Sequence, residues 1–163
     1  MIVVDTSAFV SITIGDVLTD VVNEYDVHTT EQVFDELNNT ADYDDVHGAA
    51  ADHVLSNSRD VTVHDVDDSG LRTSRIDAGE ASCVHLAEQR DADFVITDDL
   101  RALPELQQLT DARVAISPIL FRALVKRNVL TNREARATVD HVAASRDWLG
   151  APTYRRAQRL FDE

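Results

Sequence analysis

The chain opens with a short apolar run that ends at an aspartate. Ile2, Val3 and Val4 are consecutive and largely β-branched, and Asp5 follows them directly. Such a run is too short for a helix and is typical of a strand buried on both faces of a parallel sheet. Ligands of open α/β sheets bind at the carboxyl ends of the strands, so Asp5 is a candidate site residue. An alternative remains open, because Asp5 or Ser7 can also cap the following helix.

A second apolar run, at residues 94–96, also ends in acidic residues. It is followed by Thr97 and then by Asp98 and Asp99. Adjacent carboxylates at the end of a strand repel each other, so one of them should have a raised pKa unless a cation or solvent separates them. The two runs predict two central strands that each carry carboxylates at the carboxyl end.

A glutamate is also predicted near the start of a helix that follows residues 25–28, which we expect to form a strand. Thr29 or Thr30 can cap this helix, which has apolar residues at positions 33, 34 and 37. Glu36 lies on it beside the apolar stripe. Most glutamates in such a position are simply solvated, so both interpretations of Glu36 stay open.

A second such glutamate lies on the helix that begins at Asp77. Asp77 and Glu80 have the spacing of a capping box, in which both carboxylates only satisfy backbone N–H groups. Gly79 is a poor helix former and a cap alone does not require it. A glycine here indicates that another part of the chain or a ligand comes close.

Alternating strands and helices predict a three-layer α/β/α domain with a mainly parallel central sheet. Residues 8–24 should be helical with a break at Gly15, residues 61–64 should form a strand, and residues 65–75 should be an exposed connection. A helix over 131–147 and another from Pro152 exceed what the sheet needs. We therefore expect a domain over residues 1–118 and a C-terminal helical extension over 119–163 that packs on it.

The charge balance is strongly acidic. The 163 residues include 30 Asp and Glu against 15 Lys and Arg, a net charge of −15, and Lys126 is the only lysine. An acidic coat of this kind is typical of a cytoplasm at very high salt, where screening removes the self-repulsion. No apolar stretch is long enough to span a membrane, and the single cysteine, Cys83, cannot form an internal disulfide. The sequence predicts a cytoplasmic protein.

The predicted fold should bring carboxylates from four separate segments to one edge of the sheet. Neighbouring strand ends and the helices that follow them surround one crevice in such a sheet. An all-oxygen site, without sets of His or Cys ligands, favours a hard cation such as Mg²⁺ or Mn²⁺. Crowded carboxylates at this edge should have raised pKa values when no cation is bound.

These motifs resemble those of the PIN-domain family of nucleases over roughly residues 1–118, and the tail is similar to one branch of predicted nucleic-acid-binding PIN proteins, here of haloarchaeal type. The motifs are Val-Val-Asp5-Thr-Ser, a helix with Glu36, Asp77-x-Gly-Glu80-Ala and Ile-Thr-Asp98-Asp99. The resemblance implies an acidic quartet that holds the metal: Asp5, Glu36, Glu80 and Asp98. Asp99 would be an accessory or alternative ligand, whereas Asp77 is not carried over. Arg101 departs from the pattern and places a basic residue near the site.

The resemblance also implies an activity, which is hydrolysis of phosphodiester bonds by an endonuclease. The substrate would most often be RNA, single-stranded or structured, although DNA remains open. A divalent cation, Mg²⁺ or Mn²⁺, would activate water and neutralise charge on the phosphate. Asp5 and Asp98 would hold the metal directly, Glu80 would complete the shell, and Glu36 would bind a second metal or orient water.

Three alternatives remain at this stage. A non-catalytic PIN-like interaction module would keep the fold without metal-dependent cleavage. A toxin ribonuclease of a toxin–antitoxin pair is a subtype of the main hypothesis, with an antitoxin as protein partner, and a homodimer is also compatible with the extra helices. A receiver domain needs a lysine at a strand end, whereas Lys126 lies in a helical segment. An acidic surface repels a polyanion, but bound metal inverts the local charge and high salt weakens the repulsion.

Overall fold

A five-stranded parallel sheet forms the centre of the computed structural model, which describes residues 1–67, 70–71 and 73–162. The strand order is β3-β2-β1-β4-β5, and every neighbouring pair is parallel. The strands are β1 (Ile2–Val4), β2 (Val27–Thr30), β3 (Val61–His64), β4 (Phe94–Ile96) and β5 (Arg113–Ala115). The predicted three-layer α/β/α architecture is confirmed.

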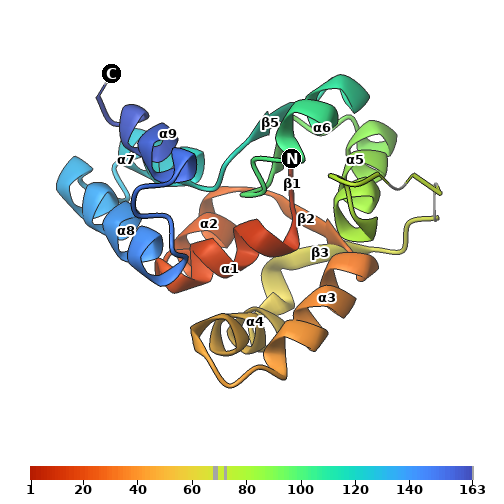
Figure 1. Cartoon of the computed structure of the whole chain (residues 1–163), viewed down its shortest axis with the longest axis horizontal. Helices are drawn as coiled ribbons and strands as arrows, with labels where there is room; N and C mark the ends of the chain where they lie inside the picture. The colour runs from red at the N-terminus through yellow and green to blue at the C-terminus, as the bar shows by residue number, and fades with distance from the viewer. Residues whose placement is uncertain (68–69, 72, 163) are drawn as a thin grey trace.

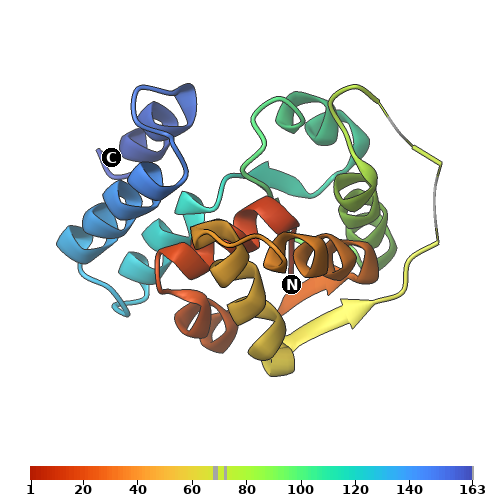
Figure 2. The same cartoon turned by 60° about the horizontal axis from the view of Figure 1, so that its bottom comes forward.

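Both apolar runs lie inside the sheet, as predicted. β1 pairs with β2 and β4, and β4 pairs with β1 and β5, so neither is an edge strand. Val3 and Val4 are fully buried. The chain builds β1, β2 and β3 outward to one edge (Figure 2, β3 in yellow) and then returns across β1 to β4. The strand order reverses between β1 and β4, which is where such sheets bind ligands.

Helices connect the strands and cover the sheet (Figure 1). Within the first part of the chain, Gly15 ends one helix and a second begins at Leu18, so the predicted break is confirmed. Thr30 rather than Thr29 caps the helix that carries Glu36. The helices before the last strand are α1 (Thr6–Ile14), α2 (Leu18–Glu24), α3 (Glu31–Ala41), α4 (Val46–Ser56), the 3₁₀ turn η1 (Ser58–Asp60), α5 (Ala78–Arg90) and α6 (Leu103–Leu109).

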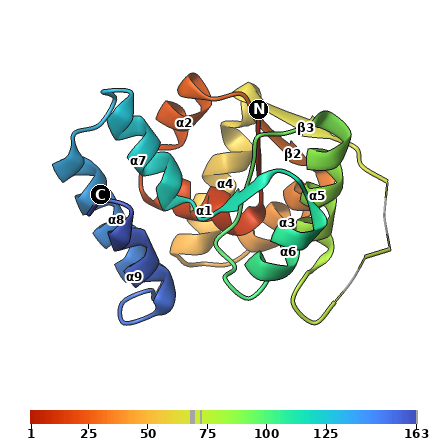
Figure 3. The ribbon, with the colours of Figure 1, turned by 90° about the horizontal axis from the view of Figure 1, so that it is seen from above.

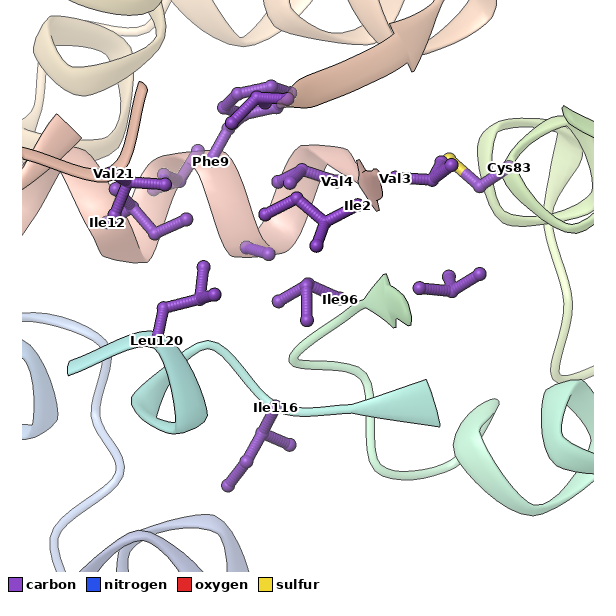
Figure 4. Packing of buried hydrophobic residues seen from close by; sticks show 14 of the residues in the cluster. Ile2, Val3, Val4, Phe9, Ile12, Val21, Cys83, Ile96, Ile116 and Leu120 are labelled. Atoms are coloured by element: carbon purple, nitrogen blue, oxygen red, sulfur yellow. The ribbon is translucent and has the colours of Figure 1, made fainter. Parts of the chain in front are cut away.

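The side chains of β1 alternate between two helical layers (Figure 4). Val3 points toward Cys83 of α5, whereas Val4 lies on the side of Phe9 of α1. Successive residues of a strand point to opposite faces, so a strand that is apolar throughout must be covered on both sides. Asp5 directly follows this buried strand, which fixes where its side chain begins.

The segment between β3 and α5 differs from the predicted exposed connection. Val66 is buried, and its carbonyl oxygen accepts a hydrogen bond of 2.8 Å from Nε2 of Gln32. Residues 68, 69 and 72 of this prediction lie outside the described residues.

Three C-terminal helices lie together beside α1 and α2 (Figure 3): α7 (Pro118–Lys126), α8 (Asn132–Ser145) and α9 (Pro152–Arg159). α7 packs on α2 and α8 packs on α1. The contact between α8 and α1 is close, since a Cβ atom on Gly15 would lie 2.8 Å from Cγ2 of Thr138. Trp148, which follows α8, is also buried.

Candidate active site

Asp5 caps α1 and also faces a cavity. Its Oδ1 accepts hydrogen bonds from the backbone N–H of Ala8 at 3.0 Å and from Oγ of Ser7 at 2.9 Å, so the capping interpretation is confirmed for Asp5. Only 3% of the residue is exposed. Burial raises the pKa of Asp5 to about 7, and the nearby charge of Asp98 acts in the same direction. Burial of a charged carboxylate costs free energy, and a residue that only caps a helix does not need to be buried.

Glu36 is held against the start of α5. Its Oε1 accepts a hydrogen bond of 3.1 Å from the backbone N–H of Gly79, and Oγ1 of Thr6 donates to its Oε2. A Cβ atom on Gly79 would lie 2.6 Å from Oε2 of Glu36. The close approach expected at Gly79 is therefore made by the carboxylate of Glu36. Burial is the main cause that raises the pKa of this carboxyl group.

Glu80 forms the expected capping box with Asp77. Oδ1 of Asp77 accepts from the backbone N–H of Glu80 at 2.8 Å, and Oε2 of Glu80 accepts from the backbone N–H of Asp77 at 3.0 Å. Glu80 is nevertheless buried, with only 6% of the residue exposed. Burial raises its pKa to about 8, and the charges of Asp77, Asp5 and Asp99 add to the effect. Both glutamates thus carry a carboxylate that favours a proton or a cation.

The adjacent aspartates after β4 have different environments. Asp98 is buried, and its two oxygens accept hydrogen bonds of 2.7 Å from the backbone N–H and from Oγ of Ser117. Burial is the largest cause that raises the pKa of Asp98. Asp99 instead has a side chain that is 29% exposed, and Nε of Arg101 lies 3.9 Å from its Oδ1. The basic residue expected near the site is therefore in place.

These carboxylates surround one cavity of about 410 Å³. Three members of the predicted quartet, Asp5, Glu36 and Glu80, line it. Of the adjacent aspartates, Asp99 lines the cavity, whereas Asp98 does not line it and accepts hydrogen bonds from Ser117. The structure thus brings residues that follow β1 and β4, together with residues of α3 and α5, to the carboxyl ends of the strands.

A hard divalent cation fits the chemistry of this cavity. The acidic side chains offer only oxygen ligands, and burial without a full counter-charge raises the pKa values of Asp5 and Glu80. Among the described residues, no three acidic, His or Cys side chains are arranged as a preformed metal site. Asp5 instead accepts a hydrogen bond from Ser7, Glu36 accepts one from Thr6, and Glu80 takes part in a capping box.

An all-parallel α/β/α domain with a carboxylate-lined cavity at its switch point belongs to the α/β proteins that bind ligands at the strand ends. A family model described as a PIN domain matches residues 1–163, and the chain belongs to the PIN-domain family. Comparison with curated proteins and with solved structures gave no match. PIN domains are generally nucleases, often ribonucleases, that bind nucleic acid and typically use divalent metals. No described helix is long and apolar enough to cross a membrane.

Two residues of this region have no counterpart in the sequence analysis. Ser117, which follows β5, donates a hydrogen bond to Asp98 after the neighbouring strand β4, and Arg146 lines the cavity from the end of α8. Neither belongs to a recognisable motif, and both are brought to the site by segments that follow β5. Tertiary structure was needed to find them.

Proposed function

We propose that this protein is a metal-dependent endoribonuclease that hydrolyses phosphodiester bonds in single-stranded or structured RNA. The observation that carries the proposal is the shared cavity of Asp5, Glu36, Glu80 and Asp99, with two pKa values raised by burial to about 7 and about 8. Membership of the PIN-domain family supports it.

Asp5, Glu80 and Asp99 would hold an Mg²⁺ or Mn²⁺ ion, with Glu36 holding a second ion or orienting water. A divalent cation supplies Lewis acidity and a nucleophile at neutral pH, and it neutralises charge on a phosphate. Thr6 and Gly79 orient the carboxylate of Glu36. Asp98 remains a candidate ligand; it accepts hydrogen bonds from Ser117, and its charge raises the pKa of Asp5.

An aromatic side chain at the edge of the cavity supports a single-stranded substrate. Tyr43 lines the cavity and is 64% exposed. Unpaired bases stack on exposed aromatic rings, whereas bases inside a duplex are not available for such contacts. RNA is preferred over DNA here because of the family, and DNA is the comparison substrate.

The test is cleavage of a labelled single-stranded RNA in high KCl with Mn²⁺, Mg²⁺ or chelator, by the wild-type protein and by Asp5→Asn. We expect cleavage only with metal, and a loss of at least about 100-fold in Asp5→Asn because a ligand is removed without a change in size. Equal cleavage by both proteins, or cleavage that chelator leaves unchanged, would contradict the proposal. A matched single-stranded DNA tests the choice of substrate.

A non-catalytic interaction module is the second candidate. The absence of a preformed metal grouping among the described residues favours it. Binding of Mn²⁺ without cleavage of RNA or DNA would support it. We also propose that residues 1–118 form the catalytic unit and that residues 119–163 cover it, while the toxin, antitoxin and homodimer hypotheses stay predictions.

A further inference from the structure

A cationic side chain lies in the acidic cavity. Six described acidic residues line it: Asp5, Glu36, Asp45, Asp77, Glu80 and Asp99. Arg146 is the one Arg or Lys among the described lining residues. Burial lowers its pKa from the ordinary value, and the charges of Asp98 and Asp5 oppose that change. An arginine side chain keeps its charge under such conditions.

The backbone around Arg146 fixes where its side chain begins. Arg146 ends α8, with its N–H bonded to the carbonyl oxygen of Val142 at 2.8 Å. Trp148 is buried, and its N–H bonds to the carbonyl oxygen of Ala143 at 2.8 Å. The close contact at Gly15 packs α8 against the end of α1. Arg146 follows α8 and lines the cavity together with Thr6 and Ser7 at the start of α1.

The guanidinium N–H groups of Arg146 are available for a ligand. Among the described residues no carboxylate forms a direct ion pair with Arg146, although Asp98 and Asp5 are near enough to influence its charge. Its five N–H donors match the oxygens of a phosphate in a planar fork. If Arg146 served only to neutralise the carboxylates, it would form an ion pair with one of them. A bound metal cation would also neutralise these carboxylates without Arg146.

We propose that Arg146 binds a phosphate of the nucleic-acid substrate beside the carboxylates, so that the C-terminal extension supplies part of the substrate site. The proposal rests on the proposed function for the identity of the substrate. The proposal explains how an acidic cavity could hold a polyanion, because a bound metal ion and Arg146 would both present positive charge to the nucleic-acid backbone. Arg146 is thus a substrate-binding residue of the extension.

The experiment measures equilibrium binding of a fluorescein-labelled single-stranded RNA by anisotropy, with Ca²⁺ as the hard cation, over about 0.2 to 2 M KCl. Arg146→Gln should weaken binding about tenfold, the usual effect of losing one charged hydrogen-bond partner. The slope of log affinity against log salt should become shallower by about 0.7, because one phosphate contact is lost. Arg146→Lys keeps the charge, so it should retain the slope with intermediate affinity.

Arg59→Gln is the matched control. Arg59 is exposed on η1, just before β3 begins, and therefore lies at the opposite edge of the sheet from the cavity. The Arg59→Gln substitution removes the same charge and should change neither the RNA affinity nor its salt dependence. Thermal unfolding of each variant shows whether the fold is kept. If Arg146→Gln does not fold, Arg146→Lys carries the test through its affinity.

Three results would overturn the proposal: unchanged binding in the Arg146 variants, an equal loss in Arg59→Gln, or no binding of RNA by the wild-type protein. A parallel loss of Mn²⁺ affinity, measured by calorimetry, would also do so, since it would mean that Arg146 only positions the carboxylates. If RNA binds through Arg146 but is not cleaved with Mn²⁺, the proposed activity fails and the phosphate contact stands.

Discussion

Acidic residues lie at both ends of the strands, called here the amino edge and the carboxyl edge of the sheet. The carboxylates at the two ends differ in burial and in the direction of their pKa shifts. At the amino edge, Asp93 is 72% exposed, and its Oδ2 lies 2.7 Å from the amino group of Met1. Arg127 similarly pairs with Glu24 at 3.2 Å. The hydrogen bond from the Met1 amino group lowers the pKa of Asp93. At the carboxyl edge, burial raises the pKa of Asp5 to about 7.

The comparison shows that density of acidic residues does not define a site in this protein. The amino edge also has a cavity, of about 590 Å³, lined by several acidic residues. Asp93 of this cavity already pairs with the Met1 amino group and Glu24 with Arg127, so a metal ion would gain little there. The carboxyl edge keeps its carboxylates buried without full compensation, and such groups bind a proton or a cation.

The largest expected difference between the edges concerns metal binding. Glu80→Gln removes one charge from the carboxyl edge and keeps the capping box, which Gln also forms. We expect Mn²⁺ affinity, measured by calorimetry, to fall about 10- to 100-fold. Asp93→Asn removes the same charge from the amino edge and should leave affinity unchanged. Equal effects of the two substitutions would remove the distinction between the edges.

A substitution near the carboxyl edge should separate activity from helix stability. Gly79→Ala places a methyl group against the carboxylate of Glu36. Helix propensity alone predicts a gain of about 1 kcal/mol in stability, whereas displacement of Glu36 predicts about a tenfold loss of RNA cleavage. We therefore expect lower activity without unfolding, measured by cleavage rate and thermal denaturation. Full activity would show that Glu36 need not occupy its present position.

The buried carboxylates of the carboxyl edge should determine how the stability of the fold changes with pH. The folded-state pKa of Asp5 is raised to about 7 from 3.8, so protonation favours the folded protein. The stabilising effect is complete below about pH 4 and is lost as the pH rises through 7, and Glu80 extends this loss to about pH 8. The metal-free protein should thus resist urea better at pH 5 than at pH 8.

Two variants check the origin of that decline. Asp5→Asn carries no charge at any pH, so the difference in unfolding free energy between pH 5 and pH 8 should shrink. Asp93→Asn should keep the difference, because Asp93 is exposed. Excess Mn²⁺ should remove the disadvantage at pH 8. A wild-type protein that is more stable at pH 8 in chelator would refute the assignment.

The smallest predicted effect involves the exposed acids, which are common at the amino edge. With a net charge of −15, self-repulsion should destabilise the fold at low ionic strength. The melting temperature should therefore rise by several degrees between low and molar KCl. A melting temperature that is independent of salt would remove the argument for a high-salt cytoplasm. The buried carboxylates of the site should contribute little, since they are screened least.

Much of the fold was predictable because its signals are local. β1 and β4 are unbroken apolar runs, and Thr131 and Pro152 correctly mark the starts of α8 and α9. Elements with weaker signals were missed. β5 has only three residues and includes the exposed Arg113, and α6 is a seven-residue helix. The strand predicted at residues 25–28 lies two residues later because Val27 pairs with Ile2 of β1.

The candidate site was predictable only in part. Asp5, Glu36 and Glu80 were found because each stands at a local landmark, the end of a strand or the first turns of a helix. Capping explained Asp5 and Glu80 equally well, and a solvated side chain explained Glu36. The structure shows Asp5 and Glu80 both taking part in helix caps. Sequence could not distinguish Asp98 from Asp99, since adjacent residues have the same local pattern. Their environments differ because Asp98 is buried beside Ser117, whereas Asp99 is partly exposed near Arg101.

The sequence by itself determined the parallel α/β architecture, the acidic charge and the helix caps, because these depend on residues that are neighbours along the chain. Tertiary structure decided which carboxylates are buried together, because the pKa of a carboxyl group depends on solvent exclusion by segments far away in sequence. It also decided that Arg146, which follows α8, lines the same cavity as Asp5, which follows β1. No local pattern encodes that contact, which arises from the packing of α8 against α1 at Gly15.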